Sequence, residues 1–144
     1  MYVGYSHKRR CAPSILYVLL VYMPMTSARD ESIEYILASA VNAPSGDNSQ
    51  PWRFRLSGDT VTIHLVPEAD ETLYNYEQRG SYLAHGALIE NIVRIARVRG
   101  YATAVELLSH EKNATARITF TSVAPVPDEY ADAVGLRATN RKPY

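Results

Sequence analysis

Residues 43–54 read APSGDNSQPWRF. This stretch combines the turn former Pro44 with the amide side chains Asn48 and Gln50 and with Trp52. Helical periodicity precedes it and strand-like alternation follows it, so we expect a loop that joins a helix to a sheet. Such a loop can present backbone N–H groups and short polar side chains to a planar polar ligand, or its amides can satisfy the loop's own backbone.

The elements on either side of the loop follow from residue spacing. A helix is expected from Ser27 or Asp30 to about Asn42, because apolar residues recur at i, i+3, i+4 and i+7. These apolar residues are Ile33, Ile36, Leu37 and Ala40. Alternation over 52–56 and 61–65, around the turn at 57–59, predicts a β-hairpin.

The second part of the chain repeats the order of a helix and two strands. A long helix is predicted from about Ser81 to Arg99, with Gly100 as its C-terminal cap, and Tyr74, Tyr76 and Tyr82 are expected to pack near its start. Residues 101–108 and 114–122 predict a second antiparallel pair. Residues 128–134 predict a short helix, after which Gly135 should release the chain. The order predicts the α+β class, with a mainly antiparallel sheet packed against a long central helix.

Composition limits the kind of protein. The chain has 144 residues, 47% of them apolar, which is compatible with one globular domain. Fifteen basic and fifteen acidic residues balance, which disfavours nucleic acid and membrane as bulk electrostatic partners. The single Cys11 and the scattered histidines fit no zinc spacing, so we expect no metal, a cytoplasmic location and no histidine in the site.

Residues 1–25 require a separate interpretation. The apolar run at 15–25 is about half as long as a bilayer-spanning helix needs to be. Basic residues before it and Thr26-Ser27-Ala28 after it resemble a weak secretory signal, whereas Met23 and Met25 are plausible true starts. We therefore interpret 1–25 as a leader, either a mis-annotated start or a weak signal-like segment.

Two basic clusters could carry function. Residues 137–144 read RATNRKPY, and in an extended chain Arg137, Thr139 and Arg141 share one face over roughly 13 Å. That face suits a mononucleotide with a phosphate, although an ordinary solvated terminus has the same composition. The cluster of Arg94, Arg97 and Arg99 is interpreted as a solvated helix end; with Trp52 it could instead form a nucleic-acid surface.

Taken together, three segments resemble the nitroreductase superfamily of flavin oxidoreductases. Residues 43–54 resemble its APSxxNSQPW loop, His85-Gly86-Ala87-Leu88-Ile89-Glu90-Asn91 its long central helix, and 137–144 its RxTxRxxY flavin-binding segment. The Arg-rich segment here follows the loop, which resembles the tandem-duplicated Acg-like subgroup. The resemblance implies that 26–144 form a partial nitroreductase-like domain, truncated to roughly the first half.

The resemblance also implies a function. It implies an FMN-dependent oxidoreductase that passes reducing equivalents from NAD(P)H through flavin to a small nitro or quinone acceptor, with no obligatory catalytic side chain. The alternative is a module that binds or sequesters flavin without turnover. A homodimer would complete the half-site. The residues implied to bind the cofactor are Pro44, Ser45 and Asn48 on one side of the flavin, Arg137 and Thr139 at its phosphate, and Arg141 at its pyrimidine ring. Gln50 and Trp52 are expected to support the loop.

Overall fold

Four strands form one sheet in which every neighbouring pair is antiparallel. The computed structural model describes residues 28–109 and 112–138. The strands are β1 (Trp52–Ser57), β2 (Thr60–Leu65), β3 (Tyr101–Leu107) and β4 (Ala114–Ser122), in the order β1-β2-β4-β3. Both predicted hairpins are therefore present. The α+β class and the antiparallel sheet are confirmed.

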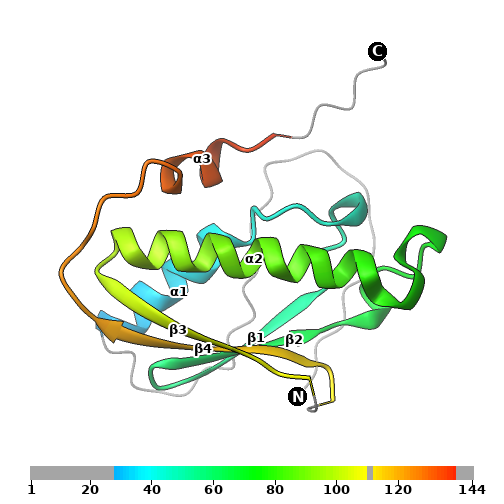
Figure 1. Ribbon diagram of the computed structural model, residues 1–144, viewed down its shortest axis with the longest axis horizontal. Helices are drawn as coiled ribbons and strands as arrows, with labels where there is room; N and C mark the ends of the chain where they lie inside the picture. Colours follow the sequence, from blue (N-terminus) through cyan, green and yellow to red (C-terminus); the bar gives the residue numbers. More distant parts are fainter. Residues whose placement is uncertain (1–27, 110–111, 139–144) are drawn as a thin grey trace.

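The helices lie on one face of this sheet. Figure 1 shows α1 (Ala28–Ala40) and the longer α2 (Arg79–Val98) side by side over the strands, with the short α3 (Ala131–Leu136) on the far side of α2. The bounds of α1 and α2 agree with the predicted helices to within a few residues. The predicted long central helix is therefore confirmed.

The core fills the space between the sheet and the helices. Alternate residues of β2 and β4 point inward, as the period of a half-covered strand requires. They meet the apolar stripes of α1 and α2, in which residues recur at helical spacing. The fully buried members include Ile33, Ile36, Leu37, Val61, Ile63, Leu88, Ile92, Ala116, Ile118 and Phe120.

Two local predictions are wrong. Tyr74, Tyr76 and Tyr82 do not pack as anchors, since they are 97%, 68% and 54% exposed. The segment forms the 3₁₀ turns η2 (Pro67–Ala69) and η3 (Leu73–Gln78), and Asn75, between the first two tyrosines, takes the buried position. Gly135 does not release the chain, because it keeps helical geometry inside α3.

The chain after β4 is held against the end of α2 at Gly100. Gly100 has φ +80°, and its carbonyl accepts a 2.8 Å hydrogen bond from the Val123 N–H. A Cβ added to Gly100 would lie 2.9 Å from the Val123 carbonyl oxygen, closer than Cβ atoms approach. Further along, the Val126 N–H donates to the Arg97 carbonyl at 3.1 Å. This close approach starts the path that leads the chain back across the helices.

Substitution of Gly100 by alanine should destabilise the fold by roughly 2 kcal/mol. The left-handed backbone penalises any L side chain, and the added methyl group must displace the Val123 backbone. Chemical denaturation measures the change. Gly86→Ala is the matched control, because Gly86 lies in α2 with nothing within 4 Å of its Cβ position and should gain up to about 1 kcal/mol. Equal effects of the two substitutions would contradict this account.

The predicted leader, residues 1–25, lies outside the described residues. Within the described residues, none of the helices combines the length and apolar character that a bilayer crossing needs. The domain bounds and the cytoplasmic location stay predictions.

Candidate functional site

The loop that follows α1 is organised by its own backbone. Its centre is the 3₁₀ turn η1 (Gly46–Asn48), closed by hydrogen bonds from Asn48 N to the Ser45 carbonyl (3.1 Å) and from Ser49 N to the Gly46 carbonyl (2.8 Å). The Gln50 N–H donates to the Ser45 hydroxyl at 3.0 Å. Ser45 therefore supports the loop, while its hydroxyl proton stays available for another acceptor.

Backbone strain is concentrated in this loop. Asp47, Asn48 and Gln50 have φ values of 46°, 57° and 49°, so three of the six non-glycine residues with positive φ in the described chain lie here. Each such residue costs about 1 kcal/mol or more, although Asn and Asp tolerate the conformation best. Groups outside the loop add to its internal hydrogen bonds in holding this conformation.

Helix α2 supplies two such groups, one at each end of the loop. At the N-terminal end, Asn91 Nδ2 donates to the Ala40 carbonyl at 3.1 Å. At the C-terminal end, His85 Nε2 lies 2.9 Å from the Pro51 carbonyl oxygen. Both residues belong to the helical segment that resembled the family's central helix. Two side chains of α2 therefore hydrogen-bond to the two ends of the loop.

His85 is buried and electrically neutral in the folded protein. Burial lowers the pKa of its imidazole below the ordinary value, and the Pro51 carbonyl opposes this shift only in part. Its ring stands edge-on to Trp52, with centroids 6.1 Å apart. The sequence predicts no histidine in the site, and His85 contacts the loop without being shown to touch a ligand. The signal that points to His85 is its place on the apolar face of α2, three and seven residues before Leu88 and Ile92.

Stability should fall on acidification below about pH 6.5, where a histidine in the unfolded chain takes up a proton. In the folded state the pKa of His85 is lowered, so the imidazole stays neutral there. The unfolded state therefore binds more protons as the pH falls, and the free energy of unfolding decreases. One proton contributes at most about 1.4 kcal/mol per pH unit. The slope levels off below the folded pKa. Urea denaturation from pH 8 to pH 5 measures it, and His85→Gln should remove this part of the slope; an unchanged slope would contradict the assignment.

A second support lies beneath the turn. The carboxylate of the buried Asp70 faces Gly46, so closely that a Cβ on Gly46 would lie 2.7 Å from Asp70 Oδ2. Asp70 Oδ1 accepts from the Thr72 hydroxyl (2.8 Å), and Asn75 Nδ2 donates to the Asp70 carbonyl (2.7 Å). Only glycine fits at position 46 without displacing this carboxylate.

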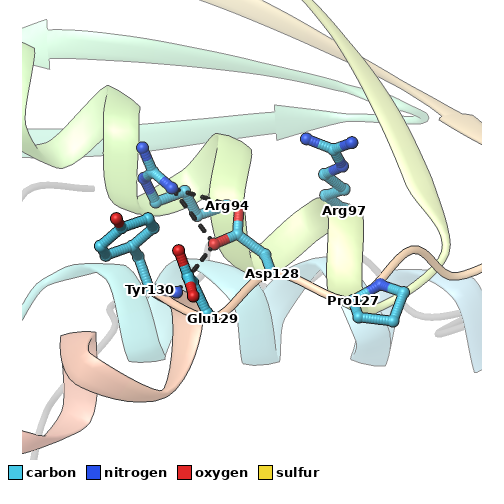
Figure 2. A pocket seen from close by; sticks show the side chains of 6 residues that line it. All are labelled: Arg94, Arg97, Pro127, Asp128, Glu129 and Tyr130. Atoms are coloured by element: carbon cyan, nitrogen blue, oxygen red, sulfur yellow. Dashed lines mark hydrogen bonds and ion pairs between the residues drawn. The ribbon is translucent and has the colours of Figure 1, made fainter.

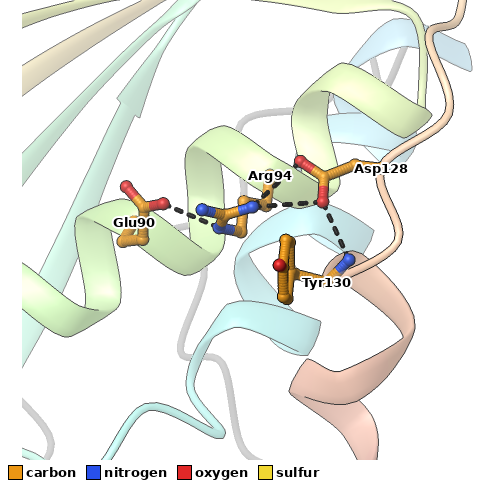
Figure 3. Close-up of polar contacts among 4 residues, drawn as sticks. All are labelled: Glu90, Arg94, Asp128 and Tyr130. Atoms are coloured by element: carbon orange, nitrogen blue, oxygen red, sulfur yellow. Dashed lines mark hydrogen bonds and ion pairs between the residues drawn. The ribbon is translucent and has the colours of Figure 1, made fainter.

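The returning chain is fastened to α2 by Arg94. Figure 3 shows its guanidinium between Glu90, with Nε to Oε1 at 2.6 Å, and Asp128, with Nη1 to Oδ1 at 3.1 Å. The Asp128 carboxylate also accepts from the Tyr130 N–H (2.9 Å), and the Tyr130 ring lies under the Arg94 guanidinium. The Tyr130 N–H and Arg94 lower the pKa of Asp128 and keep it ionised. These contacts of Arg94 hold the chain where it enters α3, which packs against α1 and α2.

Arg137 then reaches the start of the loop. Its Nε donates to the carbonyl of Asn42 at 2.5 Å, across 95 residues of sequence. Asn42 directly precedes the predicted binding loop, so one chain brings the first residue of the basic segment to that loop. Of the other candidates, Pro44 and Asn48 are exposed and Ser45 is half-buried. Thr139 and Arg141 lie outside the described residues.

The interpretation of the arginine cluster as a solvated helix end holds only in part. Figure 2 shows Arg94, Arg97 and Asp128 lining a shallow surface hollow with Pro127, Glu129 and Tyr130. Arg94 is not simply solvated, because its guanidinium forms ion pairs with Glu90 and Asp128. The nucleic-acid alternative loses its aromatic surface, because Trp52 is 7% exposed and packs in the core. Burial of Trp52 agrees with the supporting role expected for it.

Within residues 28–109 and 112–138, no three His, Cys, Asp or Glu side chains form a group that could hold a metal ion.

Known relatives match most of this chain. "Putative NAD(P)H nitroreductase acg" of Mycobacterium tuberculosis (strain CDC 1551 / Oshkosh) is 32% identical over 130 residues, covering 85% of this chain and 38% of the relative. The chain is therefore related to the nitroreductase superfamily. "Putative NAD(P)H nitroreductase Rv3131" of the same species (strain ATCC 25618 / H37Rv) is 26% identical over 118 residues, covering 79% of this chain and 34% of the relative. No protein-family model matches the chain.

The names of these relatives agree with the family that the three segments resemble. The chain spans little more than a third of the length of these two nitroreductase relatives. Within that span it contains the loop, the helix residues His85 and Asn91 that hold the loop, and Arg137 beside it. The described residues therefore supply a supported loop and, beside it, the first residue of a cationic segment.

Proposed function

We propose that this chain forms part of an FMN site of a nitroreductase-type oxidoreductase. The observation that carries the proposal is the hydrogen bond from Arg137 to the Asn42 carbonyl, which brings the first residue of the cationic segment to the start of the strained loop. A loop with supported backbone and a nearby guanidinium suits a flavin mononucleotide, which has a planar ring to cover and a phosphate to neutralise.

The residues would divide the cofactor between them. Pro44, Ser45 and Asn48 would cover one side of the ring, because Pro44 and Asn48 are exposed and Ser45 retains a hydroxyl proton. Arg137 and Thr139 would bind the phosphate, and Arg141 would place positive charge beside the pyrimidine ring. FMN, when bound, supplies the hydride chemistry between NAD(P)H and a small nitro or quinone acceptor. The protein supplies orientation and electrostatics, with no side chain as acid or base.

Flavin absorbance tests the proposal. Purified protein incubated with FMN and freed of excess should stay yellow, and NADH or NADPH added without oxygen should bleach the flavin band. Asn48→Asp is the matched loop variant, because it removes the donor of the exposed amide that should contribute to FMN binding, while aspartate, like asparagine, tolerates the positive φ at this position. A colourless protein that FMN does not protect against unfolding would refute the site.

A second candidate function is flavin binding or sequestration without turnover. This candidate rests on the supported loop and on Arg137, which are binding groups, and it needs no site for NAD(P)H. A yellow protein that neither nicotinamide bleaches would select it over the oxidoreductase.

We also propose that two copies associate. Large apolar side chains stand exposed near the start of α2, among them Leu73 and Leu83 at 96% and 78%, and β1 and β3 are sheet edges. Light scattering at micromolar concentration should give twice the mass of one chain. The mass of a single chain would exclude this association.

A further inference from the structure

His85 has hydrogen-bond partners in both the loop and the sheet. Its Nε2 meets the Pro51 carbonyl (2.9 Å) and its Nδ1 meets the Thr115 hydroxyl (2.8 Å), which in turn lies 3.2 Å from the Ile63 carbonyl. Thr115 occupies the irregular step between β2 and β4, where the register shifts at Ile63 and His64. The imidazole therefore bridges the C-terminal end of the loop and the bulged part of the sheet.

The chemistry of the partners fixes the tautomer. A carbonyl oxygen only accepts, so His85 Nε2 must carry the proton that is shared with Pro51. In the neutral ring Nδ1 then accepts the single proton of the Thr115 hydroxyl at 2.8 Å, so the longer 3.2 Å contact of that hydroxyl with the Ile63 carbonyl is not made by the same proton at the same time. The ring is held in a single orientation by two hydrogen bonds and by the edge-on contact with Trp52.

We propose that His85 is a positioning residue, which holds the binding loop in its strained conformation by donating from Nε2 to Pro51. The proposal rests on the proposed function only for its link to FMN. Pro51 directly follows Gln50, whose φ of 49° is one of the three strained values in the loop. The next amide, Trp52 N–H, donates to the Gln50 carbonyl at 2.8 Å, so the bend and the His85 contact are adjacent.

Three substitutions separate hydrogen bonding from packing. His85→Gln can place an amide N–H near the position of Nε2 and keep the donor to Pro51. His85→Phe keeps an aromatic ring beside Trp52 without a donor, and His85→Met fills the space with a flexible apolar chain if Phe does not fold. Ile118→Val, in the core of β4, is the control for loss of stability alone.

Amide hydrogen exchange of the protein without FMN reads the loop directly. In His85→Phe and His85→Met, the Gln50 and Trp52 amides should exchange about tenfold faster relative to β4 amides, the factor that corresponds to ~1.4 kcal/mol. In His85→Gln and Ile118→Val the ratio should stay within about threefold of wild type. Unchanged loop exchange in folded Phe or Met variants overturns the proposal. So does faster exchange in Gln equal to that in Phe.

FMN affinity gives the second readout. The dissociation constant should rise about tenfold in the Phe and Met variants and stay within about threefold in Gln and in Ile118→Val. A constant that follows stability alone, rising equally in Ile118→Val, overturns the positioning role. If the wild-type protein does not bind FMN, the proposed function fails, and the exchange experiment still decides whether His85 holds the loop.

Discussion

Replacement of Arg137 by alanine should weaken FMN binding by about tenfold to a hundredfold. A charge-assisted hydrogen bond contributes roughly 1.5–3 kcal/mol, and the alanine variant loses it together with a positive charge beside a dianionic phosphate. The substitution also frees the Asn42 carbonyl, where Arg137 now holds the returning chain to the loop. Equilibrium titration of FMN fluorescence measures the loss.

Two further variants make this test specific. Arg137→Lys keeps the charge but not the planar fork, so it should recover only part of the affinity. Arg55→Ala removes an exposed arginine from the outer face of β1 and should leave the dissociation constant unchanged. Equal losses of FMN affinity in Arg55→Ala and Arg137→Ala would show that the effect comes from net charge alone. Full affinity in Arg137→Ala would separate the basic segment from the flavin site.

The periodic parts of the fold could be predicted from sequence because burial acts on spacing. Ile33, Ile36 and Leu37 stand at helical intervals and are all fully buried, and the alternation of Val61 and Ile63 fixed the inward face of β2. Gly100 was predicted as a helix cap and has the expected positive φ. In each of these places the local pattern and the tertiary packing favour the same conformation.

The 3₁₀ segment before α2 could not be predicted in this way. Three tyrosines suggested packing anchors, since aromatic side chains usually bury large areas. The buried position belongs to Asn75 instead, because the start of α2 needs an acceptor for the Ser81 N–H and the Asp70 carbonyl needs a donor. The spacing of residues in the sequence does not show which buried donors and acceptors will need a hydrogen-bond partner.

The candidate site likewise has a part that could be predicted from sequence and a part that could not. The residues of the loop were recognisable as a motif, but the groups that hold it come from distant positions: His85 reaches Pro51 across 34 residues, Asn91 reaches Ala40 across 51, and Arg137 reaches Asn42 across 95. A scattered histidine and a helix-end arginine cluster look alike whether they are solvated or paired. Only the packing of α2 against α1 and the returning chain decides which they are.

Replacement of Asn75 by aspartate should destabilise the fold by about 2–4 kcal/mol at pH 7, the largest stability effect expected for a nearly isosteric change. The buried Asn75 amide donates to the Asp70 carbonyl (2.7 Å) and to the Ser81 hydroxyl (2.9 Å), while its oxygen accepts from the Ser81 N–H (3.0 Å). A carboxylate retains that acceptor but faces the Asp70 carbonyl with another oxygen. Because Asp70 lies against Gly46, the loop should lose its lower support as well.

The pH dependence of this variant identifies the cause. Burial and the facing carbonyl should raise the pKa of the introduced carboxyl above its ordinary value, and the protonated acid can donate to Asp70 again. The excess cost over wild type should therefore shrink as the pH falls through the raised pKa. Asn48→Asp adds the same charge at an exposed position of the loop and should change stability by no more than about 0.5 kcal/mol. An excess cost in Asn75→Asp that does not depend on pH would show that shape, rather than the missing donor, is responsible.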